Sequence, residues 1–87
     1  MMSTFPPRYG VTIQNNLQNE VSVHSRPPPS GSFRFMCMIS PSKTLIVACN
    51  AGDELAVYEL GRFVAGFTVN TSNNTFVVCP EVSADVM

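Results

Sequence analysis

The sequence predicts an all-β fold, a small antiparallel β-sandwich or barrel of about seven short strands. Short runs rich in Val, Ile, Thr, Phe and Tyr recur along the chain, and Gly, Pro, Asn and Ser separate them. No stretch keeps the period of an amphipathic helix, and Ala, Leu, Lys and Glu never cluster as a surface helix requires. Charged residues make up only 13% of the chain, and polar turn formers take their place.

The length of 87 residues is that of one domain. We divide the chain into an extended N-terminal arm at 1–9, which contains Pro6-Pro7, a single β domain at 10–80, and a flexible C-terminal tail at 81–87. The tail follows Pro80 and has the character of a loose chain end. A chain this short buries somewhat over ~60% of its unfolded surface, so its margin of stability is small.

Two strands with an alternating pattern follow the arm. Val11 and Ile13 occupy one side of YGVTIQ (9–14), and valines occupy one side of EVSVHS (20–25). Each run therefore predicts a strand with one buried face. The polar stretch NNLQN between them predicts a turn that joins the two strands as a hairpin.

The next segment, RPPPSG (26–31), predicts an extended surface linker, because proline cannot donate a ladder hydrogen bond. Two strands that are apolar on both faces follow it, FRFMCMI (33–39) and TLIVAC (44–49). The turn NAGD then leads into ELAVYEL (54–60). Its β-branched and aromatic residues favour a strand over a helix.

The last two strands are FVAGFTV (63–69) and TFVVC (75–79), with the polar turn NTSNN between them. Simple alternation puts Phe63, Ala65, Phe67 and Val69 on one side of the first of these strands. Gly66 inside that strand indicates a bulge or a close approach of another group.

The middle strands are apolar even on the side that should face solvent. A sheet of a small sandwich has one inner and one outer face, and large contiguous apolar patches are rare on monomers. We therefore predict self-association, as a homodimer or higher oligomer, through the outward residues Met36, Met38, Ile46, Ala48, Tyr58 and Leu60. The alternatives are an outer face that binds a ligand or partner, an arm folded over that face, or a bulge that shifts the register.

The sequence predicts a non-catalytic protein without a cofactor or a metal. His24 is the only histidine, and no local signature pairs it with a nucleophile. The cysteines Cys37, Cys49 and Cys79 lack the close spacing of metal ligands, and their odd count argues against a disulfide framework. We expect three buried thiols. A Cys37–Cys49 bridge and a small enzyme that uses Cys37 or His24 are the alternatives.

The second functional prediction is a glycan or small-ligand binding protein. The Pro-rich loop and the Asn70–Asn74 turn would flank its pocket. The polar contacts would come from His24, Asn70, Asn73 and Asn74.

The charge distribution limits the classes of partner. Net charge is −1 and the basic residues are scattered, so the basic surface of a nucleic-acid-binding protein is missing. No apolar run is long enough to span a membrane. The start, MMSTFPPRYG, lacks the regions of a signal peptide, and with the odd cysteine count this favours a cytoplasmic protein. A secreted mature chain is the alternative. The predicted partners are a second copy of the chain and a protein or glycan.

Overall fold

The computed structural model describes residues 8–28, 31–72 and 74–80, and these residues form seven strands and no helix. Each strand agrees with its predicted range to within a residue at either end, and the all-β fold class is confirmed. The first strand begins at Arg8, which the sequence assigned to the arm. Residues 1–7 and the tail at 81–87 lie outside the described residues. The strands are β1 (Arg8–Asn15), β2 (Val21–Arg26), β3 (Arg34–Ile39), β4 (Thr44–Asn50), β5 (Glu54–Glu59), β6 (Arg62–Thr68) and β7 (Thr75–Val78).

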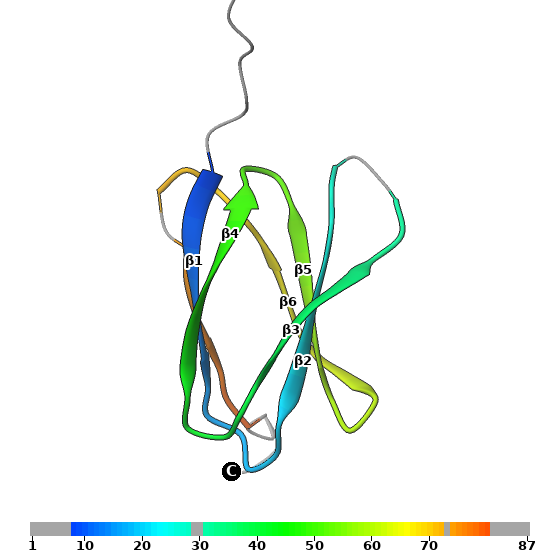
Figure 1. Cartoon of the computed structure of the whole chain (residues 1–87), viewed down its shortest axis with the longest axis vertical. Helices are drawn as coiled ribbons and strands as arrows, with labels where there is room; N and C mark the ends of the chain where they lie inside the picture. The colour runs from blue at the N-terminus through cyan, green and yellow to red at the C-terminus, as the bar shows by residue number, and fades with distance from the viewer. Residues whose placement is uncertain (1–7, 29–30, 73, 81–87) are drawn as a thin grey trace, which may run out of the picture.

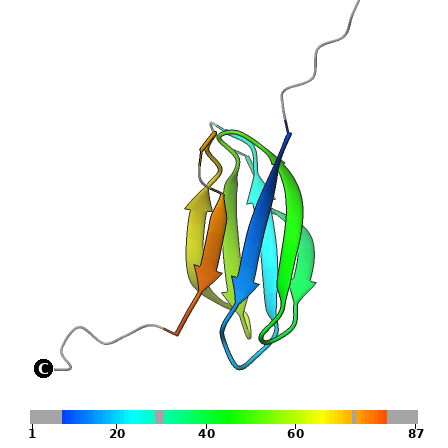
Figure 2. The ribbon, with the colours of Figure 1, turned by 90° about the vertical axis from the view of Figure 1, so that its left-hand side faces the viewer.

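The strands form two sheets that pack face to face (Figure 1). The three-stranded sheet has the order β4-β1-β7, and the four-stranded sheet has the order β3-β2-β5-β6. Figure 2 shows the three-stranded sheet in front, with β1 between β7 and β4 and the other sheet behind. The arrangement is therefore a sandwich and not a single closed barrel.

The predicted hairpin between the first two strands is wrong, because β1 and β2 belong to different sheets. The buried amide of Asn15 shapes the turn that follows β1. Its Nδ2 donates to the carbonyl oxygens of Asn19 at 3.0 Å and Ile39 at 2.9 Å. Its Oδ1 accepts from the N–H of Leu17 at 2.8 Å. This anchor directs the chain to the opposite sheet and places Leu17 in the core.

The central strand β1 is antiparallel to β4 but parallel to β7. The parallel pair departs from the purely antiparallel sheet that the sequence predicted. It arises because the chain reaches β7 from the four-stranded sheet and not through a hairpin from β1. The regular β1–β4 ladder runs from the Arg8–Asn50 pair to the Gln14–Thr44 pair without a bulge.

The core lies between the sheets and follows the alternation that the sequence predicted for β1 and β2. Val11 and Ile13 meet Val21 and Val23, and all four side chains are buried. Dry aliphatic packing of this kind is the main source of stability for a small sandwich. The remaining buried apolar members of the cluster are Leu17, Ile39, Cys49, Leu55, Val57, Val69 and Val78.

A β-bulge resets the faces of β3. Phe35 pairs with His24 and Cys37 pairs with Val23, which leaves Met36 as an extra residue in the edge strand. Met36 consequently packs against the core instead of facing outward as predicted, and Phe35 faces solvent. The bulge was among the alternatives that the sequence left open.

A second bulge lies between β5 and β6. Tyr58 pairs with Phe63 and Val57 pairs with Ala65, so Val64 is the extra residue. The predicted alternation of β6 is therefore wrong at its start. Phe63 shares the outer face with Tyr58, whereas Ala65 packs against the core.

Candidate functional site

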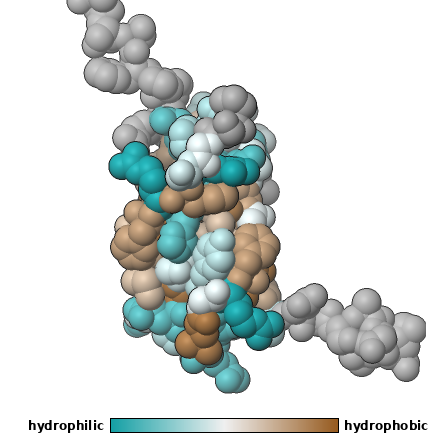
Figure 3. All heavy atoms as spheres, turned by 90° about the vertical axis from the view of Figure 1, so that its right-hand side faces the viewer, coloured by the Kyte–Doolittle hydropathy of each residue, from teal (hydrophilic) through white to brown (hydrophobic). Residues whose placement is uncertain are grey.

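The outer face of the four-stranded sheet carries a continuous row of four rings, one from each strand. Neighbouring rings meet edge to face, with centroid distances of 5.7 Å, 5.1 Å and 5.8 Å along the row. On this side of the molecule, brown apolar side chains surround a teal and pale polar centre (Figure 3). In order across the sheet, the rings are those of Phe35, His24, Tyr58 and Phe63. We call these four residues the aromatic row.

The two ends of the aromatic row are the most exposed. Phe35 is 59% exposed and Phe63 is 60% exposed, and both face outward because of the bulges. Gly66 gives the ring of Phe63 room to lie on the sheet, since a Cβ at position 66 would lie 3.2 Å from its Cζ. The bulges and this glycine together build an apolar surface where a small monomer would normally be polar.

Charge on this face is balanced within the sheet. The Nε of Arg26 lies 2.6 Å from Oε1 of Glu54, and the guanidinium carbon of Arg26 lies 4.6 Å from the ring centroid of Phe33. The guanidinium thus bridges a carboxylate and an aromatic ring. The pair leaves this part of the face without net charge.

A shallow hollow of about 260 Å³ lies on the same face. Phe33 and Phe63 line it together with the small residues Ala56 and Gly66. The polar side chains of Glu54 and Thr68 also line it. The hollow therefore combines aromatic rings with a few polar groups, which is the composition of many ligand sites.

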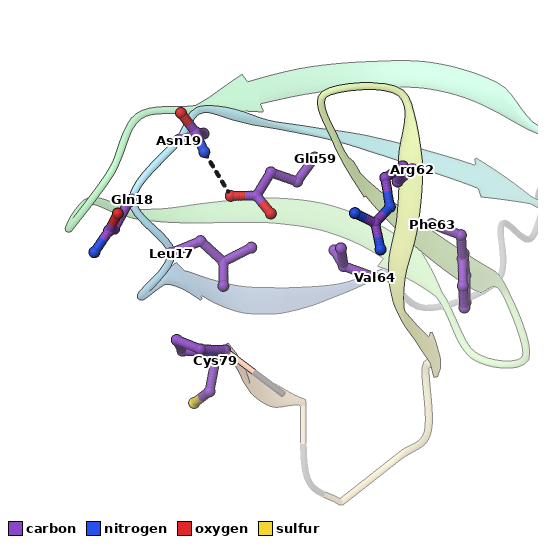
Figure 4. A pocket seen from close by; sticks show the side chains of 9 residues that line it. Leu17, Gln18, Asn19, Glu59, Arg62, Phe63, Val64 and Cys79 are labelled. Atoms are coloured by element: carbon purple, nitrogen blue, oxygen red, sulfur yellow. Dashed lines mark hydrogen bonds between the residues drawn. The ribbon is translucent and has the colours of Figure 1, made fainter. Parts of the chain in front are cut away.

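A second hollow of about 400 Å³ lies at one end of the sandwich (Figure 4). Asn19 Nδ2 donates to Glu59 Oε2 at 3.1 Å on one side of it. Arg62 also lines the hollow, and its guanidinium has no hydrogen-bond or ion-pair partner among the described residues. The other lining residues are Leu17, Gln18, Phe63, Val64, Cys79 and Pro80.

The structure does not bring the six predicted interface residues together. Met38 and Tyr58 lie on the face of the aromatic row, where both pair with Ser22 of β2. Ile46 and Ala48 belong to β4 in the other sheet and face the opposite side of the sandwich. Leu60 lies at the β5–β6 turn with φ of 52° and is 78% exposed, and Met36 packs inward.

The predicted ligand contacts are also dispersed. Asn70 and Asn74 bind each other across the β6–β7 loop, because Asn74 Nδ2 donates to the Asn70 carbonyl at 2.7 Å and Asn70 N–H donates to Asn74 Oδ1 at 3.0 Å. Their amides thus hold the loop together, and neither hollow is lined by them. His24 belongs to the aromatic row, and Asn73 lies outside the described residues.

The described residues do not bring Cys37 and His24 together as the nucleophile and the base of a catalytic mechanism. His24 Nε2 lies 3.0 Å from Ser22 Oγ, and the described residues place no carboxylate against the other ring nitrogen. Cys37 packs against the core on the opposite side of the sheet from His24. Within the described ranges, no three His, Cys, Asp or Glu residues are grouped as metal ligands.

The three thiols differ in exposure, and none of them is in a disulfide bond. Cys49 is buried, and Cys37 is half-buried. Burial raises the pKa of the Cys37 thiol above its ordinary value. The expectation of three buried thiols is wrong for Cys79, which is exposed at the end hollow.

Sequence reasoning missed Phe35 and Phe63, the two exposed ends of the aromatic row, because the bulges that turn them outward depend on pairing between strands. Gly66 was the only local signal, and it was interpreted as a bulge or a close approach. The close approach is the ring of Phe63.

Comparisons with models of known protein families, with curated proteins and with solved structures find no match. In the described part of the chain, no helix has the length and apolarity needed to cross a membrane.

Proposed function

We propose that this protein is a non-catalytic interaction module that forms a homodimer through the aromatic row. The observation that carries the proposal is the unbroken chain of ring contacts across all four strands, with its two terminal phenylalanines more than half exposed. Exposed apolar surface of this extent on a small domain is typical of a protein–protein contact.

A second copy of the chain is the partner that suits this face. A two-fold axis that lies between the two faces, runs parallel to the strands and crosses the middle of the aromatic row would set Phe35 of one copy opposite Phe63 of the other. The Arg26–Glu54 pair is neutral, so two copies of the face meet without repulsion between like charges. The ion pair leaves little net charge on this part of the face to attract a charged partner.

The energetics favour a weak dimer. Full burial of a phenylalanine contributes ~1.5–3 kcal/mol, so burying the exposed part of each terminal ring contributes ~1–2 kcal/mol. Two such rings from each copy contribute ~4–8 kcal/mol against an association cost of at least ~4 kcal/mol. The surplus of at most ~4 kcal/mol corresponds to a dissociation constant of about 1 mM. Contacts of Met38 and Tyr58 add to this surplus, and we expect a weak dimer that dissociates on dilution below the millimolar range.

The test is the molar mass in solution, measured by size-exclusion chromatography with light scattering over a dilution series. We expect the Phe35→Ser/Phe63→Ser variant to associate measurably more weakly than the parent over the same concentration series, and a variant that associates as strongly as the parent would refute the proposal. Leu60→Ser is the matched control, because it removes an even more exposed apolar side chain at the β5–β6 turn, outside the aromatic row. A parent that is monomeric at every concentration, or a control that dissociates equally, would refute the proposal.

Glycan or small-ligand binding is the second candidate, and the hollow beside Phe33 and Phe63 favours it. An aromatic ring beside the polar side chains of Glu54 and Thr68 is suited to a sugar ring. We therefore propose the sheet face as the binding site in place of the Asn70–Asn74 turn, because the amides of that turn bond within their own loop. A glycan array, followed by a thermal-shift titration of any hit against Phe33→Ala, tests it. A hit that stabilises parent and variant equally would count against this site.

A further inference from the structure

The two sheets have four edge strands, and three of them carry features that discourage pairing with another strand. The edge strand β3 contains a bulge and begins at Arg34. The edge strand β6 contains a bulge and begins at Arg62. The edge strand β7 has only four residues and is followed closely by Pro80. Bulges, charges, short length and proline are the usual protections of a sheet edge.

The fourth edge strand, β4, carries none of these protections. Its seven residues, TLIVACN, contain no charge and no proline, and its ladder with β1 is regular throughout. Ile46, near its middle, is 70% exposed. A long, flat and apolar edge is a template for the addition of another strand.

The hydrogen-bond pattern shows which main-chain groups of β4 point outward. Asn15 N–H donates to the carbonyl of Lys43 at 2.9 Å, so alternate residues from Lys43 onward bond to β1. Leu45 and Val47 belong to this bonded set. Thr44 and Ile46 therefore direct their N–H and C=O groups away from β1. Within the described ranges, these groups have no main-chain partner.

We propose that β4 pairs antiparallel with β4 of a second copy and joins the two three-stranded sheets into one continuous sheet. In the register that uses the outward groups, Thr44 of each copy exchanges both of its hydrogen bonds with Ile46 of the other. The two-fold axis then passes between the two Leu45 residues. The order becomes β7-β1-β4 followed by β4-β1-β7 of the partner copy.

A second copy fits this edge because the pairing is self-complementary. On the outer face, each Ile46 lies against Thr44 of the other copy, and no like charges meet anywhere along the strand. The edge lies in the sheet opposite the aromatic row. The contact is consequently additional to the proposed dimer face, and each can form without the other.

The first test separates the two contacts. In a Phe35→Ser/Phe63→Ser background, only the edge remains, and sedimentation velocity over a concentration series measures its dimer constant. We expect Ile46→Lys to weaken that dimer by at least about tenfold, because charge on an edge strand opposes strand addition. Val77→Lys is the matched control: Val77 is also exposed on the outer face of this sheet, but it lies on β7 across β1. We expect the control to change the constant less than about twofold.

The second test fixes the register and does not depend on how well the lysine variants fold. In a Cys79→Ser background, we expect Leu45→Cys to form a disulfide-linked dimer under mild oxidation. Directly opposed residues in a non-hydrogen-bonded antiparallel pair have Cα atoms ~4.5 Å apart, which lies within disulfide reach. Val77→Cys is the control.

The edge pairing is overturned if the Phe35→Ser/Phe63→Ser background is monomeric at every concentration. It is also overturned if a cysteine at position 45 cross-links no faster than a cysteine at position 77. Neither result depends on whether the aromatic row forms a dimer, so the two proposals fail separately.

Discussion

Replacing Asn15 by alanine is expected to destabilise the protein strongly, although the change removes no apolar group. The amide is fully buried and makes three hydrogen bonds, to Asn19, Ile39 and Leu17. Alanine leaves the N–H of Leu17 and the carbonyl of Ile39 without the partner that this amide supplies. Water can replace the bond to Asn19, which is exposed.

The size of the effect follows from the two buried groups. Each buried polar group left without a partner costs about 1–3 kcal/mol, so the expected loss is about 2–6 kcal/mol. A domain of this length has a total free energy of unfolding of about 4–13 kcal/mol. The variant should therefore lose a large share of its stability, with a decrease in Tm of at least about 8 °C.

Urea unfolding followed by far-UV circular dichroism measures this loss in a two-state fit. Asn16→Ala is the matched control, since the neighbouring Asn16 is exposed and its Oδ1 only accepts from Gln14 Nε2 at 2.9 Å. We expect the control to remain within about 0.5 kcal/mol of the parent. Asn15→Asp keeps an acceptor for Leu17 but brings no donor to Ile39, and it should also be destabilised. A loss below about 1 kcal/mol for Asn15→Ala would refute the role given to this amide.

Two further predictions concern the sheet face and the thiols. Gly66→Ala should displace the ring of Phe63, because the new Cβ would lie 3.2 Å from that ring. We therefore expect it to weaken the proposed dimer in a light-scattering dilution series, and a dimer constant equal to that of the parent would contradict this packing. Iodoacetamide at pH 8 should modify the exposed Cys79 well before Cys37, because the half-buried Cys37 thiol has a raised pKa. Mass spectrometry measures the two rates of modification, and equal rates would contradict the described burial. The folded state holds the Cys37 proton more tightly than the unfolded state, because burial raises the pKa of this thiol. Its contribution to stability is therefore complete below the unfolded pKa and is lost as the pH rises through the folded pKa. If a Cys37→Ser variant loses as much stability at alkaline pH as the parent, Cys37 is not the cause of that loss.

The positions of the seven strands could be predicted from the sequence because the signals are local. Turn formers and β-branched runs alternate along the chain, and each strand begins and ends where that pattern changes. The inward sides of β1 and β2 were predictable for the same reason, since Val11, Ile13, Val21 and Val23 occupy alternate positions in unbulged stretches.

The tertiary structure decided which strands pair, and with it the composition of both surfaces. Asn15 bonds to Ile39, 24 residues away in the chain, and this contact replaces the expected hairpin with a crossing between the sheets. Each bulge depends on the register between two strands, and one extra residue moves Met36 inward and Phe35 outward. The sequence showed that the middle strands carry more apolar residues than one buried face needs. Their division between the core, the aromatic row and the β4 edge depends on contacts between distant segments, which alternation along a single strand cannot encode.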